Sequence, residues 1–305
     1  MTPATPTRPA PLRPLRGVRI VSLALNLPGP AALWRLRAMG ATCLKIEPPA
    51  PKGAAAGTPG DPMGQYSPAA YAALHDGIRT RTLDLKSERG QAALHKELAR
   101  ADVLLTSFRP SALVKLGLSW KPLHRLYPAL SMVTVVGGPG PLAEVPGHDL
   151  TYVAEHGLVP GLDLPATLFA DMGGALMACE AVLTAVLTQK TSGKGVLQAV
   201  ALSEAAAWLA LPRTWGLTLP AGPIGGAHAG YRVYPCRDGR VAVAALEPHF
   251  AARLCAVAGI APFGADTMFA PASHAAVAAF LQGKTRKQLD RLAVQHDIPL
   301  HTLPR

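Results

Sequence analysis

The hydrophobic pattern of the first two hundred residues alternates between short apolar or β-branched runs and longer stretches of helix-forming residues. Six strands are expected, at residues 18–23, 42–47, 81–85, 101–106, 129–136 and 196–202. Five helices are expected, at residues 31–39, 87–99, 111–116, 172–189 and 203–211. Gly40 stands where a glycine commonly ends a helix, and Ser87 where a side chain caps one. Strand, helix and strand within about thirty residues form a βαβ unit. The alternation therefore predicts a doubly wound parallel sheet in a Rossmann-like α/β domain.

The pattern changes after the last of these helices. Residues 216–230 are rich in glycine and proline, and two apolar runs, 231–236 and 241–246, then flank an Asp-Gly pair. Asp-Gly between apolar runs is a hairpin signal, so a smaller α+β domain is expected there. The expected organisation is a mobile arm over residues 1–16, a large α/β domain over 17–215, a linker over 216–230 and a small α+β domain over 231–305. Within the large domain, residues 50–70 are expected to form a long surface loop.

The composition indicates a soluble globular protein. Hydrophobic residues make up 49% of the chain and charged residues 16%, with a mean hydropathy of +0.21. Residues 1–16 have no apolar segment of the kind that a secretory signal needs. The most apolar stretch, 172–187, carries Glu180 and is shorter than the roughly 20 residues that span a bilayer. We therefore expect a cytoplasmic location and no membrane partner.

The charge balance indicates an anionic partner. Lysine and arginine exceed the acidic residues by 30 to 19, which gives a net charge of +11. No helix has a basic face and no basic stretch is interleaved with aromatic residues, so nucleic-acid binding is not expected. Of the anionic partners considered, a small molecule that carries phosphate groups is therefore the expected one.

The four cysteines stand far apart and form no metal-binding pattern. Cys43, Cys179, Cys236 and Cys255 include no CxxC pair, and no histidine lies at zinc-site spacing from them. Buried free thiols in a reducing compartment are expected, and no metal site.

Three positions carry candidate acid–base chemistry. Asp149 can cap a helix that leaves His148 at its positive end, where the charged imidazole is disfavoured; spacing alone favours a plain capping role. Asp171 precedes Gly173-Gly174, and two glycines inside a helix cost roughly 1 kcal/mol each against alanine. Close approach of a ligand and tight helix packing explain that pair equally well. Glu247 ends the expected strand 241–246, and spacing alone favours a solvated strand end.

Several segments together carry a family resemblance. They are residues 15–21, Pro28-Gly29-Pro30, 39–49, 82–86, 101–105, Phe108-Arg109-Pro110, 115–118 and 191–195. With these segments, the chain from about residue 15 to residue 299 resembles the family III CoA-transferase (CaiB/BaiF) superfamily, which also contains 2-methylacyl-CoA racemase. The resemblance implies an enzyme that acts on an acyl-CoA thioester. It also implies an interlocked homodimer, and a final segment that returns to the large domain, which we expect to be missing from this chain.

Two chemistries compete within that superfamily. Transferases resemble the chain at Asp171, the carboxylate that attacks an acyl-CoA thioester. Racemases resemble it at three places: Gly147-His148-Asp149 with Tyr152, Asp171, and Glu247-Pro248. Because all three are present, we favour a racemase or epimerase, with CoA transfer through Asp171 as the first alternative and a non-catalytic CoA-binding protein as the second.

The resemblance also implies a role for each residue. Neutral His148 takes the α-proton and protonated Asp171 returns one on the other face, within the 2.6–3.2 Å reach that proton transfer needs. The backbone N–H of Asp149 polarises the thioester oxygen, and Glu247 of a partner subunit orients His148. The predicted CoA path is lined by Arg109, Leu83, Asp84, Ser107, Phe108 and Tyr152. For the apolar members core packing is a serious alternative, and for Arg109 a solvated loop position. No cofactor is expected beyond the CoA moiety of the substrate.

Overall fold

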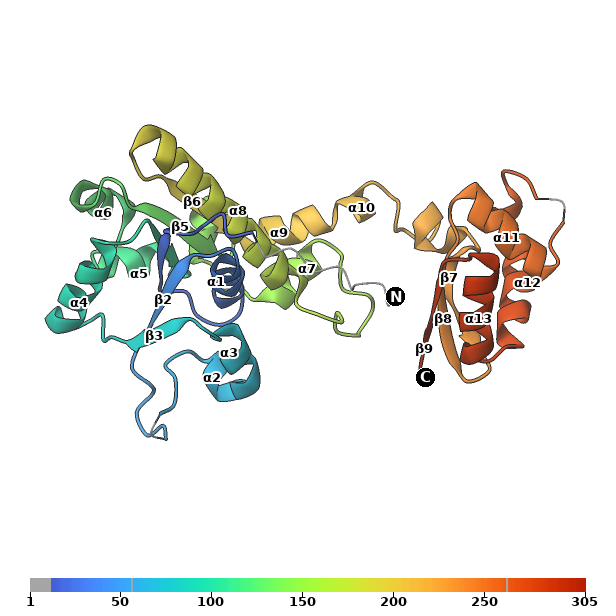
Figure 1. The fold of residues 1–305 in the computed structure, drawn as a ribbon, viewed down its shortest axis with the longest axis horizontal. Coiled ribbons are helices and arrows are strands. Elements are labelled where there is room, and N and C mark those ends of the chain that lie inside the picture. Colours follow the sequence, from blue (N-terminus) through green and yellow to red (C-terminus); the bar gives the residue numbers. More distant parts are fainter. Residues whose placement is uncertain (1–11, 56, 262) are drawn as a thin grey trace, which may run out of the picture. The chain divides into compact units, whose positions relative to one another are not determined.

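The chain forms two compact units. The computed structural model describes residues 12–55, 57–261 and 263–305, and the units comprise residues 1–210 and 211–305 (Figure 1). The division falls at Ala210, so residues 211–215 group with the second unit and not with the large domain as expected. The stretch 216–230, expected to be a linker, also groups with the second unit.

Only the last residues of the predicted mobile arm, 12–16, are among the described residues. Residues 1–11 of it lie outside the described residues. Leu15 is buried, and its N–H donates a 3.0 Å hydrogen bond to the carbonyl of Met39. Leu15 therefore belongs to the packed domain, and the prediction that the arm extends to residue 16 was wrong at this position.

The first unit is built on a parallel sheet in the order β3-β2-β1-β4-β5-β6. Its strands are β1 (Arg19–Ser22), β2 (Thr42–Glu47), β3 (Arg79–Thr82), β4 (Val103–Thr106), β5 (Ser131–Val136) and β6 (Leu197–Ala201). The predicted doubly wound α/β fold is confirmed, with strand ends shifted by up to three residues. Strand β3 ends at Thr82, so Leu83 and Asp84 lie in the loop that follows it.

The two faces of the sheet are covered by different helices because successive side chains of a strand point to opposite sides. In β4, Val103 and Leu105 pack with α1 (Pro28–Ala38) and α8 (Phe169–Ser192), whereas Leu104 packs with α4 (Glu88–Leu98), α5 (Pro110–Lys115) and α6 (Trp120–Leu126). Figure 1 shows α1 and α8 side by side, in agreement with their packing. Both cores are mainly aliphatic.

The remaining helices of this unit are α2 (Met63–Tyr66), α3 (Pro68–Leu74), η1 (Gly140–Glu144), α7 (Asp149–Glu155) and α9 (Leu202–Leu209). The helix predicted at 203–211 is α9, and the predicted helix start at His148-Asp149 is that of α7, whereas α2, α3 and η1 were not predicted. The prediction of an uninterrupted loop over 50–70 was wrong, because α2 and the start of α3 lie inside it. Helix α6 was not predicted either.

Helix α8 is longer than expected. Its 24 residues meet the length and hydropathy needed to cross a membrane, and 44% of the apolar window is buried inside the protein. The length argument against a membrane span was therefore wrong. The helix packs on α1, α9 and strands β5 and β6, as the core helix of a globular domain does.

The second unit holds a three-stranded antiparallel sheet in the order β7-β8-β9. Its elements are α10 (Leu211–Thr214), η2 (Pro223–Ala227), β7 (Tyr231–Cys236), β8 (Gly239–Ala244), α11 (Pro248–Ala258), η3 (Thr267–Phe269), α12 (Pro271–Gln282), α13 (Arg286–His296) and β9 (Leu300–Leu303). The predicted hairpin is present, with Arg237 and Asp238 as its turn.

Strand β8 ends at Ala244, so Glu247 does not end a strand. It caps α11, with Pro248 at the first helical position.

The four cysteines are buried free thiols, as expected.

Candidate functional site

A cavity opens where the strand order of the parallel sheet reverses. The loops that follow β1 and β4 run to opposite sides there, which is the usual ligand position in open α/β sheets. The cavity has a volume of about 170 Å³. Five of the ten predicted site residues line it: Ser107, Arg109, His148, Tyr152 and Asp171.

Asp171 lies in the first turn of α8, at the third helical position. The buried carboxylate of Asp149 accepts a 3.0 Å hydrogen bond from the backbone N–H of Asp171. Leu168, the residue before the helix, has no side chain that could cap it, so Asp149 does so and fixes the start of α8 against α7. Asp149 therefore positions Asp171.

The pKa of Asp171 is raised to about 6. Burial is the largest cause, and repulsion from the Asp149 carboxylate adds to it, whereas His148 acts in the opposite direction. A carboxyl group with this pKa is populated in both protonation states near neutral pH, which is what a general acid and base requires.

His148 caps α7 with an extended backbone and an exposed side chain. The Thr151 hydroxyl locks this turn: it donates to the His148 carbonyl at 2.7 Å and accepts from the His148 N–H at 3.2 Å. Asp149 and Leu150 follow in the first turn, where N–H groups have no acceptor within the helix. The turn thus presents an imidazole beside helix-start N–H groups.

Tyr152 forms a wall of the cavity and needs two glycines beside it. A Cβ atom at Gly137 would lie 2.4 Å from the Tyr152 Oη, and one at Gly147 would lie 2.6 Å from it. Burial and the Asp171 carboxylate raise the pKa of Tyr152, and the Arg109 guanidinium opposes them. Charges of both signs from the cavity lining therefore act on Tyr152.

We expect alanine at both glycines to destabilise the fold, but removal of the Tyr152 hydroxyl should restore stability only at position 137. At position 137 the next closest ring atom, Cζ, is 3.2 Å away, whereas at position 147 both Cε1 and Cζ lie 2.8 Å away. Gly137→Ala should cost about 1–3 kcal/mol of stability, and adding Tyr152→Phe should recover most of it. Gly147→Ala should stay destabilised with Tyr152→Phe, because the ring itself clashes. Urea unfolding of the single and double variants measures this; equal recovery at both positions would contradict the contact geometry.

The glycine pair after Asp171 serves helix packing. A Cβ at Gly174 would lie 2.3 Å from Leu202 Cδ2, and one at Gly173 would lie 3.1 Å from Leu209 Cδ1. Of the two explanations that the sequence left open, the structure supports close packing of α8 against α9.

Five predicted residues do not line the cavity: Asp149, which acts through Asp171 as described above, and four others. Leu83 is buried in the core beneath α4, and Phe108 packs against the same core. Asp84 is exposed, and its carboxylate accepts a 3.0 Å hydrogen bond from the Lys86 N–H. Glu247 belongs to the second unit and is exposed. Contact of these residues with CoA or with His148 stays a prediction.

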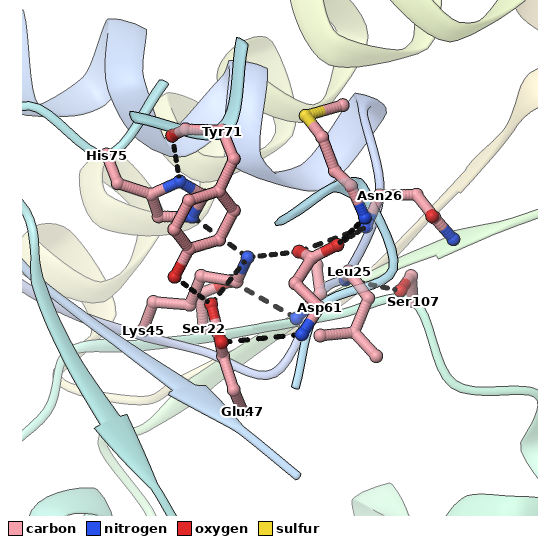
Figure 2. A network of polar contacts seen from close by, with 11 residues as sticks. Ser22, Leu25, Asn26, Lys45, Glu47, Asp61, Tyr71, His75 and Ser107 are labelled. Atoms are coloured by element: carbon pink, nitrogen blue, oxygen red, sulfur yellow. Dashed lines mark hydrogen bonds and ion pairs between the residues drawn. The ribbon is translucent and has the colours of Figure 1, made fainter. Parts of the chain in front are cut away.

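Three residues that the sequence pattern did not identify lie at or near the cavity. Asn26 lines it, and Asp61 hydrogen-bonds the Asn26 N–H (Figure 2). Tyr66 is electrostatically coupled to the site, because burial raises its pKa and the charges of Asp61 and Asp171 raise it further. The sequence contained one signal for Asp61. Lys45 stands in a strand of the parallel sheet, and a buried ammonium needs a carboxylate partner.

Known proteins resemble the chain over nearly its whole length. Residues 15–304 match the family described as CoA-transferase family III. The chain belongs to this family. α-Methylacyl-CoA racemase of Homo sapiens is 30% identical over 77% of this chain and 62% of its own length. Cinnamoyl-CoA:phenyllactate CoA-transferase of Clostridium sporogenes is 33% identical over 62% of this chain and 49% of its own length.

Solved structures share the fold of this family III chain. Rv3272 of Mycobacterium tuberculosis superposes with a TM-score of 0.80 at 24% identity, over 97% of this chain and 84% of that one. A CaiB/BaiF family protein of Brucella suis has a TM-score of 0.75 at 21% identity, over 96% and 85%. The chain spans about half to just under two thirds of the length of the first curated relatives that it matches. Their names include both racemases and CoA-transferases.

Proposed function

We propose that this protein acts on an acyl-CoA thioester and inverts the α-carbon of a 2-methylacyl group by 1,1-proton transfer. The observation that carries the proposal is that His148 and Asp171 line one cavity, while the pKa of Asp171 is about 6. The Asp171 carboxyl thus titrates in the range that acid–base catalysis near neutral pH needs, and an imidazole, the commonest side chain in such catalysis, lines the same cavity.

The reaction requires one proton to leave the α-carbon and another to arrive on the opposite face. Neutral His148 accepts the first proton as the C–H bond breaks, and the electron pair moves toward the thioester oxygen. The backbone N–H of Asp149, at the start of α7, is the proposed donor to that oxygen. Protonated Asp171 then supplies the new C–H bond and becomes a carboxylate. Exchange with water resets both groups.

Basic residues around α5 suit the phosphates of CoA. Arg109 caps the start of this helix and lines the cavity, and Lys115 is its last residue. Lys115 and Lys86 also line a second hollow of about 640 Å³. Charge of this sign at the carboxyl ends of the strands fits an anionic nucleotide handle, and the net charge of +11 agrees with it.

The proposed active form is a homodimer. Glu247 lies in the second unit, beside the start of α11, and in our proposal the second unit of a partner subunit brings this carboxylate to His148. A carboxylate at one imidazole nitrogen fixes the tautomer and leaves the other nitrogen free to act as base.

The test is exchange of the α-proton in heavy water. A panel of acyl-CoA thioesters with and without a 2-methyl group is incubated with the protein, and deuterium at the α-carbon is followed by NMR. Uptake with inversion supports the proposal. A hydroxylamine-sensitive acyl or CoA adduct on Asp171, without exchange, would establish CoA transfer instead. Binding of CoA thioesters with neither reaction would indicate a binding protein.

A further inference from the structure

A buried charge cluster lies under the loop that forms one wall of the cavity. Lys45 and Glu47 of β2 point to the α1 side of the sheet, and α3 covers them with Tyr71 and His75 (Figure 2). The Lys45 ammonium contacts Asp61, lies 3.2 Å from a Glu47 oxygen and lies 2.9 Å from the His75 Nε2. Lys45 and Asp61 are completely buried. We call Lys45, Glu47, Asp61, Tyr71 and His75 the Lys45 cluster.

The contacts define the hydrogen-bond roles in this cluster. Burial, and then the Lys45 ammonium, lower the pKa of His75, so its imidazole is neutral at pH 7. Its Nε2 faces an ammonium, which can only donate, so Nε2 accepts and Nδ1 carries the proton toward the Tyr71 carbonyl at 2.6 Å. Tyr71 donates to Glu47 at 2.8 Å. Glu47, Asp61 and His75 have spacing that would suit a metal ion, but the Lys45 ammonium already contacts all three.

The Lys45 cluster reaches the cavity through Asp61 and Asn26. Both oxygens of the Asp61 carboxylate accept from the Asn26 N–H, at 3.1 and 3.2 Å, and one also accepts from the Met63 N–H at 2.9 Å. The preceding N–H, of Leu25, donates to the Ser107 hydroxyl at 3.1 Å. Two consecutive amides of this loop are therefore held by side chains from other parts of the fold.

Asn26 has a backbone conformation that needs such support. Its φ of +63° lies in the left-handed region, which costs a non-glycine residue roughly 1–2 kcal/mol. Asn26 lines the cavity together with Asp171 and His148. Figure 2 shows its carboxamide pointing away from the Lys45 cluster. The anchored backbone fixes where this amide group is presented.

We propose that Asn26 contacts the acyl-CoA through its carboxamide, and that Asp61 is a positioning residue which holds Asn26 in place. The Lys45 ammonium contacts the Asp61 carboxylate on the side away from Asn26 and holds it in place, so the cluster shapes the cavity wall without touching the substrate. The proposal rests on the proposed function, because it takes an acyl-CoA thioester as the ligand. A carboxamide offers both a donor and an acceptor to the amides and carbonyls of such a ligand.

A double-mutant cycle on acetyl-CoA affinity tests the proposal. Asn26→Gly removes the carboxamide but keeps the left-handed backbone favourable, so it should weaken binding about 3- to 10-fold. Asp61→Asn should weaken it by a similar factor, and the double variant should be no weaker than Asn26→Gly by more than about twofold. Tyr71→Phe removes the hydrogen bond to Glu47 on the other side of the cluster and leaves the bonds between Asp61 and Asn26, so it should change affinity by less than about twofold in either background. The proposal would be overturned if the losses of affinity in Asp61→Asn and Asn26→Gly multiplied in the double variant. It would also be overturned if Asn26→Gly bound acetyl-CoA as tightly as the wild type.

Backbone hydrogen exchange gives a readout that does not depend on any activity. In the ¹⁵N-labelled full chain, protection of the Asn26 amide should fall at least about tenfold in Asp61→Asn and persist in Tyr71→Phe. Asp61→Glu keeps the charge beside Lys45 but displaces the carboxylate, and it takes the place of Asp61→Asn if that variant does not fold. Unchanged protection in the Asp61 variant would refute the anchoring role. Absence of α-proton exchange in the wild-type protein would overturn only the proposed function, since acetyl-CoA affinity and amide protection still judge the role of Asn26.

Discussion

Asp171→Asn is expected to lower acyl-CoA turnover by at least about 10³-fold while stabilising the folded protein above pH 6. The loss follows because the amide cannot exchange a proton with the substrate, and acid–base groups contribute about 10²–10⁴ to rates. In the rival chemistry the same variant lacks the attacking carboxylate. Both mechanisms therefore predict loss of activity.

The gain in stability follows from the raised pKa. The Asp171 carboxyl has a pKa of about 6 in the folded protein and 3.8 as its ordinary value. The folded state binds the proton more tightly, so the wild-type protein loses stability as the pH rises from about 4 through 6. Asparagine resembles the protonated carboxyl and does not titrate. The difference in unfolding free energy should thus be near zero below pH 4 and on the order of 2 kcal/mol above pH 6.

Chemical denaturation at pH 4, 5, 6 and 8 measures this difference, and the heavy-water assay measures the activity. A matched control is Asp163→Asn, which changes an exposed carboxylate of the loop before α8 and should leave both quantities unchanged. Equal stability of Asp171→Asn and wild type at pH 8 would contradict the raised pKa. Such a result would remove the main support for Asp171 as an acid near neutral pH.

The parallel sheet could be predicted because its strands are short apolar runs between helix-forming stretches. Strand β4 illustrates this, since all four of its residues are buried. Helices α2 and α3 could not be predicted in this way, because the Gly/Pro-rich sequence before them gives no periodic signal and the contacts of α3 with the sheet join residues far apart in the chain. Tyr71 and His75 cover Lys45 only once the chain has folded.

The candidate site was predictable only where a local sequence pattern marks its residues. His148 and Asp149 stand in a cap-like sequence at the start of a helix, and this local pattern proved to be α7. The hydrogen bond that the Asp171 N–H donates to the Asp149 carboxylate joins residues 22 positions apart, and no local pattern contains it. Leu83 and Phe108 show the opposite case: apolar residues expected along the CoA path pack into the core. The anchoring of the left-handed Asn26 backbone could not be inferred, since the carboxylate that accepts from its N–H lies 35 residues away.

His148→Gln is expected to separate proton transfer from CoA transfer. Glutamine keeps a polar side chain of similar reach but has no titratable nitrogen. If His148 is the base on one face of the α-carbon, deuterium uptake should fall about 10²- to 10⁴-fold. Affinity for acetyl-CoA should change little, because our proposal assigns the CoA phosphates to Arg109 and to the lysines near α5 and not to His148.

The control is His156→Gln, which changes a second histidine of the same segment. His156 follows the last turn of α7 and is not among the residues that line the cavity. Its variant should exchange the α-proton at the wild-type rate. Full exchange in His148→Gln would eliminate His148 as the base. Loss of exchange in His148→Gln with retained transfer of CoA to a carboxylic acid would show that Asp171 works as a nucleophile, and that the imidazole serves a separate reaction. A one-base mechanism through Asp171 alone would instead give exchange without inversion, because one group reaches only one face of the α-carbon.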